Sequence, residues 1–326
     1  MPRIVEPDEG AIAAAAEILR EGGAVAFPTE TVYGLGADTF NARAVLSVYE
    51  LKQRPADRPL SALVTGPAQA EKLTSSWDDR CRRLAGRFWP GPMTLVLPRH
   101  PEVPDSATAG INTIAVRCPR NDIAQSLLEA FGWPISAASA NRSGGISPTL
   151  ASHVAGDFPN APELMVLDGG RCKIGIESTV LDLTRQPPRI LRLGAISAGE
   201  LRELIGEVAT PGADAASASR AAVAPHYAPR TSIEIVEPEQ LAECVAEESR
   251  QGRRVVVLCF DKSGVRPPHE AIEMPQGAGE YAQVLYEALH KADSLACDRI
   301  IVEEPPASNE MWKVVRNRLK QSTSHH

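Results

Sequence analysis

The sequence predicts an α/β protein of two domains, and three observations lead to this prediction. Short apolar runs alternate with helical patterns along the chain. A stretch of small residues, 206–225, buries little apolar surface and divides the chain. The 326 residues, 43% of them hydrophobic, suffice for about two domains with a core each. We therefore expect domains at 1–205 and 230–326, joined by a linker at 206–229.

The first domain is expected to be a twisted mixed sheet with helices. Asp8 and Asn41 can cap the first two helices, which end at Gly22-Gly23 and near Lys52. Further helices are expected at 78–88 and 122–131. The expected strands are 24–27, 60–64, 93–97, 113–118, 135–138, 164–167 and 179–183. Some of these strands follow each other without room for a crossover helix, which favours mixed over purely parallel pairing.

The second domain repeats a simpler alternation of strands and helices. Strands are expected at 232–236, 255–259 and 299–302, and helices at 237–250, 279–297 and 309–321. This order is typical of a small doubly wound, Rossmann-like α/β domain.

Charge and composition exclude several classes of protein. The net charge is −7 and no block of five or more like charges occurs, so general electrostatic binding to nucleic acid is not favoured. Apolar stretches are shorter than the roughly 18 residues that span a bilayer, and the N-terminus lacks the pattern of a signal peptide. The six cysteines form no C-x-x-C pair, so neither a zinc site nor a disulfide framework is indicated. We expect a cytoplasmic protein with no membrane partner.

Common nucleotide-binding and hydrolase motifs are absent, including the P-loop and G-x-G-x-x-G. Polar segments set among Gly and Pro beside the apolar strands are the remaining candidates for a site. The first, 27–36, offers two hydroxyls, a carboxylate and a phenol closed by two glycines. It could bind a small polar ligand, and an ordinary capped turn explains it as well.

The segment Lys52–Leu60 places three cations at a helix end and in a proline loop. The helix dipole explains a cation at the position of Lys52, with a contribution of about 0.3–1 kcal/mol. It does not explain Arg54 and Arg58, which neighbouring prolines hold with little freedom. These residues suit a clamp for a polyphosphate.

Three further segments combine strand ends with polar residues. In 113–117, alternation puts Thr113, Ala115 and Arg117 on one face, so Arg117 projects where the strand ends. In 136–144, small polar residues let a ligand approach the backbone. In 175–180 a hydroxyl pair begins a strand, and an Arg and a Gly follow at 192 and 194. Taken singly, an arginine at a strand end is more often part of a surface ion pair.

Together these segments resemble a known family. The ordered set PTETVYGLG, KQRPADRPL, FWPGPMTLVL, TIAVRCP, SAASANRSGGISPT, GIESTVLDL and ILRLGAI closely resembles the threonylcarbamoyl-AMP synthase family, with its YrdC-like fold, over about residues 10–200. The segment 226–229, HYAP, and the C-terminal part are similar to the long, two-domain form of that enzyme.

The resemblance implies a reaction that joins L-threonine, bicarbonate (or carbon dioxide) and ATP into L-threonylcarbamoyladenylate, with release of pyrophosphate. Lys52 and Arg54 would be catalytic. The implied ATP contacts are Lys52, Arg54, Arg58, Thr113, Ser139, Asn141, Ser147, Arg192 and Tyr227. The implied threonine contacts are Thr31, Arg117, the backbone around Ala137, and Ser178.

The resemblance also implies partners. Mg²⁺ is expected with the ATP phosphates, without a dedicated protein site, because no carboxylate pair suggests a metal cage. A downstream tRNA-modifying transferase is expected to use the product.

The chain departs from the family pattern at two places. The strand at 60–64 has no His where many relatives have one, and the linker lacks the usual Pro-Gly-Met and basic residue before His226. The resemblance implies that the linker closes over the nucleotide.

Two alternatives remain open from the sequence. An RNA-binding module is suggested by the Arg-rich first part, although its 21 basic and 23 acidic residues before position 206 leave it slightly acidic. A carbamoyl-transfer domain of the same fold would be expected to carry zinc-finger segments, and C-x-x-C pairs are absent.

Overall fold

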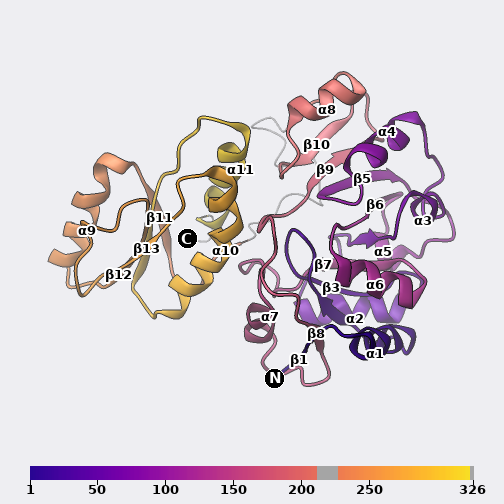
Figure 1. Ribbon diagram of the computed structural model, residues 1–326, viewed down its shortest axis with the longest axis horizontal. Coiled ribbons are helices and arrows are strands. Elements are labelled where there is room, and N and C mark those ends of the chain that lie inside the picture. The colour runs from indigo at the N-terminus through magenta and orange to yellow at the C-terminus, as the bar shows by residue number, and fades with distance from the viewer. Residues whose placement is uncertain (211–226, 324–326) are drawn as a thin grey trace. The chain divides into compact units, whose positions relative to one another are not determined.

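The computed structural model describes residues 1–210 and 227–323, which form two compact units (Figure 1). The first unit comprises the described residues of 1–143 and 148–223, and the second those of 144–147 and 224–326. The short segment Gly144–Ser147 thus groups with the C-terminal part of the chain, although its sequence neighbours belong to the first unit.

The first unit is built on a ten-stranded sheet that mixes parallel and antiparallel pairs. In spatial order the strands are β1 (Arg3–Val5), β8 (Met165–Leu167), β2 (Val25–Phe27), β3 (Gly34–Asp38), β7 (Ile135–Ser139), β4 (Ser61–Leu63), β6 (Thr113–Arg117), β5 (Met93–Pro98), β9 (Thr179–Asp182) and β10 (Arg189–Arg192). The short segment 28–33 joins β2 to β3, which pair antiparallel because so few residues cannot form a crossover. The expected mixed sheet is confirmed.

Eight helices of the first unit lie within the described residues: α1 (Glu9–Arg20), α2 (Ala42–Lys52), α3 (Pro67–Glu71), α4 (Asp79–Phe88), α5 (Asp105–Thr108), α6 (Asp122–Phe131), α7 (Ala151–Asp157) and α8 (Ala198–Ile205). The predicted caps are confirmed, since Asp8 accepts a hydrogen bond from the Ala11 amide at 2.7 Å and Asn41 accepts one from the Ala44 amide at 3.2 Å. At the other end of α2, Gln53 adopts a left-handed conformation (φ 51°) that ends the helix beside Lys52.

Apolar side chains attach these helices to the sheet in three clusters. Leu84 of α4 and Leu201 of α8 pack with the β5 residue Leu95. Val48 of α2 packs with Leu35 of β3, in a cluster that also includes α7. α1 and α6 contribute to a third cluster with residues of β2, β4 and β7. Because each buried aliphatic side chain contributes about 1.5–3 kcal/mol, these clusters hold the sheet residues near the site in place.

The second unit has a four-stranded parallel sheet, as the doubly wound prediction requires. Its strands, in spatial order, are β11 (Ile233–Val236), β14 (Arg299–Glu303), β12 (Val255–Cys259) and β13 (Glu270–Glu273). Its described helices are the 3₁₀ helix η2 (Pro238–Gln240), α9 (Leu241–Arg250), α10 (Ala278–Ser294) and α11 (Glu310–Ser322). The expected helix at 237–250 therefore begins later, because Pro238 starts a 3₁₀ turn first.

Two predictions about local structure need correction. Gly34–Asp38 is a strand, not the closing part of a turn, and Gly36 permits it, since a Cβ there would lie 2.5 Å from Cγ2 of Ile135. The predicted linker at 206–229 is also too wide. Val208 is buried in the first unit, where Ala209 pairs with Arg189, and Tyr227 is buried in the second. Residues 211–226 lie outside the described part of the chain.

Candidate active site

One face of the ten-stranded sheet carries several of the predicted site residues. Residues paired across strands point to the same face, as do alternate residues within a strand. Ser61 of β4 pairs with Ala115 of β6 on one side and with Ala137 of β7 on the other. By alternation, this face, called the site face below, includes the predicted residues Thr113, Arg117, Ala137 and Ser139.

The site face continues across β5 to the far edge of the sheet. Val96 of β5 pairs with Ala115, and Thr94, two residues earlier in β5, pairs with Val180 of β9. Val180 in turn pairs with Arg192 of β10. Arg192 therefore lies on the site face with Arg117, although 75 positions separate them in the sequence.

Small side chains keep the middle of the site face accessible. Gly34 of β3 pairs with Ser139, and Ser61 and Ala115 stand at the centre of the sheet. Ser61, Ala115 and Ser139 are half-buried, whereas neighbours on the opposite face such as Val116 are fully buried. Ser61 presents only a small hydroxyl to this face, and the strand has no His.

Lys52, the last residue of α2, contacts the backbone around the end of β7. Its ammonium donates hydrogen bonds to the backbone carbonyls of Ser139 and Asn141, and the side chain is almost completely buried. Burial lowers the pKa of Lys52 to about 7, and the positive charge of Arg54 acts in the same direction. The structure thus brings together three residues of the predicted ATP site.

Arg54 and Arg58 belong to one closed loop. The Arg54 guanidinium donates to the carbonyl oxygens of Arg58 and Pro59, each at 3.0 Å. The Tyr49 hydroxyl donates to the same Arg58 carbonyl at 2.9 Å. These bonds, rather than the prolines alone, hold the cations where β4 begins.

Arg117 forms a buried ion pair that the sequence did not predict. Nη2 of Arg117 lies 2.7 Å from Oε2 of Glu30, and the two side chains are only 9% and 3% exposed. Glu30 was visible in the sequence as the carboxylate between Thr29 and Thr31, but nothing in the pattern connected it to Arg117. An arginine buried this deeply requires a counter-charge, which Glu30 provides.

Thr31 lies beside Glu30 in a segment held by the backbone of residues 174–175. The Ile174 amide donates to the Glu30 carbonyl at 2.7 Å, and the Gly175 amide donates to the Thr31 carbonyl at 3.1 Å. The hydroxyls of Thr29 and Thr31 are 2.9 Å apart. The first and fifth polar segments of the sequence are therefore neighbours in the fold.

Ser178 and Arg192 form a second cluster on the site face. The Arg192 guanidinium donates to the Ser178 hydroxyl at 2.9 Å and to its carbonyl at 3.0 Å, and Thr94 lies 2.8 Å from the same hydroxyl. Gly194 permits this approach, since a Cβ there would lie 2.4 Å from the Thr179 amide nitrogen. Arg192, predicted for ATP, thus contacts a residue predicted for threonine.

Ser147 and Tyr227 belong to the second unit. The Tyr227 amide donates to the Gly145 carbonyl at 3.2 Å, and His290 lies 3.3 Å from the Ser147 carbonyl. The Tyr227 ring stacks on Tyr286 with centroids 5.4 Å apart, and the Arg318 guanidinium lies 5.4 Å from the Tyr227 centroid. Tyr227 is therefore part of the packing of the second unit, and its contact with a nucleotide stays a prediction. His226 lies outside the described residues.

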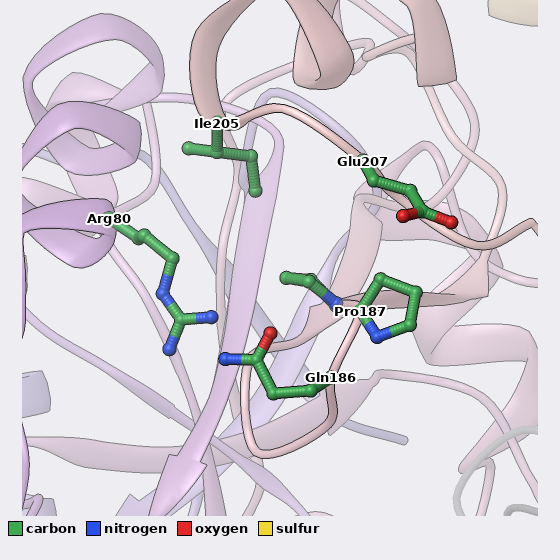
Figure 2. A pocket seen from close by; sticks show the side chains of 6 residues that line it. Arg80, Gln186, Pro187, Ile205 and Glu207 are labelled. Carbon is green, nitrogen blue, oxygen red and sulfur yellow. The ribbon is translucent and has the colours of Figure 1, made fainter.

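A surface cavity of about 350 Å³ lies elsewhere on the first unit (Figure 2). Figure 2 shows Arg80, Gln186 and Glu207 around it, from α4, from the turn between β9 and β10, and from the residues after α8. A second cavity of about 550 Å³ lies beside α1 and α2 and is lined in part by Glu50 and Glu163. Neither is lined by a residue of the predicted site.

The residues that the structure describes contain no group of three or more His, Cys, Asp or Glu side chains that could hold a metal ion. Within the same ranges, no helix has the length and hydropathy needed to cross a bilayer.

Comparison with known proteins covers both units. The family model of the Sua5, YciO and YrdC proteins, described as telomere recombination, matches residues 17–194. A second model, described as threonylcarbamoyl-AMP synthase, C-terminal domain, matches residues 196–324.

Individual relatives match over nearly their whole length. The threonylcarbamoyl-AMP synthase of Pyrococcus abyssi (strain GE5 / Orsay) is 39% identical over 98% of this chain and 95% of its own, and that of Bacillus subtilis (strain 168) is 38% identical over 95% and 92%. The crystal structure of P. abyssi Sua5 complexed with L-threonine has a TM-score of 0.90 at 37% identity, with coverage of 100% of this chain and 97% of that one. Both units are thus accounted for, and the chain belongs to the threonylcarbamoyl-AMP synthase family in its two-domain form.

Proposed function

We propose that this protein makes L-threonylcarbamoyladenylate from L-threonine, bicarbonate or carbon dioxide, and ATP, and releases pyrophosphate. The observation that carries the proposal is the arrangement of the site face, which has polar and cationic residues at both ends of β6. Membership of the threonylcarbamoyl-AMP synthase family supports the same reaction.

The first of these groups, where β4 and β6 begin, suits the phosphates of ATP. Its members are Lys52, Arg54, Arg58, Thr113, Ser139 and Asn141. Guanidinium groups held by short loops can form paired hydrogen bonds to phosphate oxygens, and the small residues near Ser139 allow the backbone to approach. We assign ATP binding to this group and call it the phosphate group.

The second group, where β6 ends and β9 begins, suits an amino acid. Arg117 can bind a carboxylate, while Thr31 and Ser178 offer hydroxyls for a polar side chain. That P. abyssi Sua5 has been crystallised with L-threonine supports threonine as this substrate. Arg117 and Thr113 are at opposite ends of β6, so roughly 13 Å separates the two groups along the strand. Substrates that react with each other must therefore lie along the site face.

The chemistry needs positioning and charge neutralisation rather than a protein nucleophile. A neutral threonine amine adds to carbon dioxide, and an oxygen of the resulting carbamate attacks the α-phosphorus in line with the departing pyrophosphate. Negative charge grows on the phosphate oxygens during this displacement. Cations of the phosphate group, fixed before the substrate arrives, stabilise that charge. We assign Lys52 and Arg54 this role.

Mg²⁺ would accompany the triphosphate in this reaction. The members of the phosphate group carry cations, hydroxyls and an amide and no carboxylate, so they offer few ligands that the ion prefers. The ion would therefore be held largely by phosphate oxygens and water.

We further propose that the reaction takes place in the cytoplasm and supplies a tRNA-modifying transferase. All six cysteines are free, which is typical of proteins in a reducing compartment. The product is a mixed anhydride of a carbamate and a phosphate, a form activated for transfer of the threonylcarbamoyl group to an amine.

Labelled substrates test the proposed reaction directly. The purified protein is incubated with L-threonine, labelled bicarbonate and ATP labelled in the α-phosphate, and we expect one product that contains both labels, together with pyrophosphate. Omission of either threonine or bicarbonate should abolish both. Absence of the doubly labelled product, with tRNA binding that weakens steeply as salt rises, would favour an RNA-binding module instead.

A further inference from the structure

Glu30 is a buried carboxylate beside the predicted threonine contacts. It is 3% exposed, and its backbone carbonyl is fixed by the Ile174 amide at 2.7 Å. One carboxylate oxygen, Oε2, lies 2.7 Å from Nη2 of Arg117. Among the described residues, the other oxygen, Oε1, and the Nε of Arg117 have no hydrogen-bond partner. An acceptor and a donor, both buried, are thus available side by side.

The charge of Glu30 restricts what Arg117 can bind. A substrate carboxylate on Arg117 brings a second negative charge next to the carboxylate of Glu30, and two anions sharing one buried cation repel each other. A positive charge on the same ligand removes this penalty. In an α-amino acid the ammonium is attached to the carbon next to the carboxylate, so it arrives at the required place. The pair of Glu30 and Arg117 therefore fits a zwitterion better than a simple carboxylic acid.

We propose that Glu30 binds the α-ammonium group of threonine, opposite the contact between Arg117 and the carboxylate, and accepts a proton from that group during carbamate formation. The proposal rests on the proposed function, to which it adds a further catalytic residue.

A proton leaves the ammonium nitrogen for a carboxylate oxygen of Glu30, and the electron pair of the broken N–H bond stays on nitrogen. That pair forms the N–C bond to carbon dioxide, while one C–O π pair moves onto oxygen. The nitrogen then loses its extra proton to water and leaves a neutral carbamate nitrogen with a carboxylate. Glu30 returns its proton to solvent before the next cycle. A general base is needed here because only the unprotonated amine is nucleophilic.

Other titratable groups near Glu30 do not compete for this role. Cys118, next to Arg117 in the chain, and Cys172 both interact electrostatically with Glu30. Burial raises the pKa of Cys118 to about 11 and that of Cys172 to about 12, so both remain neutral thiols at physiological pH. Glu30 is therefore the base in this cluster.

Binding of matched ligands tests the contact without any catalysis. Calorimetry compares L-threonine with the analogue whose amine is replaced by hydroxyl, 2,3-dihydroxybutanoate. The wild-type protein should bind the hydroxy acid about 10- to 100-fold more weakly, because the ammonium contact is lost. Glu30→Gln should weaken threonine binding by a similar factor and should strengthen binding of the hydroxy acid, because the repulsion between the two carboxylates is removed. Equal affinity of the wild-type protein for the two ligands would overturn the proposal, even if the variant does not fold.

The pH dependence of adenylate formation tests the proton transfer. At pH 7 the Glu30→Gln variant should be about 100-fold slower than wild type, within the range of general-base effects. Its rate should rise about tenfold per pH unit towards the pKa of the free amine, because the solvent must then supply the unprotonated form. Glu163→Gln, at the exposed second cavity, is the matched control and should behave as wild type.

The outcomes separate this proposal from the function on which it rests. A wild-type protein that makes no adenylate removes the proposed function. A wild-type protein that makes it, with a Glu30→Gln variant of unchanged rate and pH profile, removes the role of Glu30 alone. Equal loss of threonine and hydroxy acid binding in the variant would mean that Glu30 only orients Arg117, which also contradicts the proposal.

Discussion

The sheets of the two units differ in the side chains of their central strands. In the second unit, β12 is Val255-Val256-Val257-Leu258-Cys259 and every one of these residues is buried, so large apolar side chains cover both faces. In the first unit the central strands β4, β6 and β7 place Ser61, Ala115 and Ala137 on the site face. The small residues leave room for a ligand on the site face, whereas β12 leaves none on either of its faces.

The buried carboxylates of the two units differ in the number of their arginine partners. In the second unit Glu248 is paired with two arginines, since its carboxylate lies 2.6 Å from Arg253 and 3.2 Å from Arg299. In the first unit the described ion-pair partner of Glu30 is a single arginine, Arg117. The two arginines around Glu248 indicate a structural role, whereas the single ion pair of Glu30 and Arg117 lies beside the predicted threonine contacts and indicates a place for a charged ligand.

Loss of a cation from the phosphate group should have the largest effect. Arg54→Ala is expected to lower kcat/KM for ATP about a thousandfold, because charge-assisted contacts strengthen as the transition state forms. Lys52→Ala should act in the same way. Steady-state release of pyrophosphate measures the effect, and Lys313→Ala, an exposed residue of the second unit, is the control. Activity within twofold of wild type for both variants would remove the phosphate assignment.

Removal of the negative charge of Glu248, which pairs with two arginines, should affect only the stability of the protein. Glu248→Gln is expected to lower the free energy of unfolding by about 2 kcal/mol, less than for a fully buried pair because both arginines are partly exposed. Urea denaturation measures this change. The KM values for threonine and ATP should not change, and a changed KM would show that the second unit takes part in substrate binding.

Arg117→Lys tests the amino-acid end of the site face. Lysine cannot reproduce the planar fork of arginine, so we expect the KM for threonine to rise about 30-fold. The KM for ATP should stay within a factor of two. Initial rates with each substrate varied in turn distinguish these effects, and equal increases for both would place Arg117 with the phosphate group.

Burial of Lys52 leads us to expect that the free energy of unfolding depends on pH, an effect smaller than those above. Burial lowers the pKa of Lys52 to about 7, whereas an unfolded lysine titrates near its ordinary value. Between these pH values the unfolded state binds more protons, so stability rises with pH. From pH 7.5 to 9, the free energy of unfolding of wild type should rise by up to about 1.4 kcal/mol per pH unit more than that of Lys52→Met. Parallel curves for the two proteins would contradict the lowered pKa.

Sequence patterns predicted well those elements whose ends or faces are determined by residues close together in the sequence. Asp8 and Asn41 begin helices because their side chains satisfy amides a few residues away, and this needs no knowledge of the fold. Alternation in β6 placed Arg117 and Thr113 on one face before any partner strand was known. The motif resemblance identified the family, which the comparisons confirm.

Predictions failed where the determining contact is distant in sequence. Gly34–Asp38 has little apolar alternation, and it becomes a strand because β7 pairs with it from a hundred residues further along the chain. The ion pair of Glu30 and Arg117 is likewise created by the sheet and not by local sequence. The packing of Tyr227 on Tyr286 depends on helix α10, which no feature of the HYAP segment indicates.

The segment Gly144–Ser147 belongs to the second unit although it lies within the sequence of the first. The carbonyls of Gly144 and Gly145 accept hydrogen bonds from the amides of Ala228 and Tyr227, and the Ser147 carbonyl contacts His290. The two units are therefore not separable by a single cut in the polypeptide. In a protein truncated after residue 210, the carbonyls of Gly144 and Gly145 would lose these hydrogen bonds and would be hydrated by water instead.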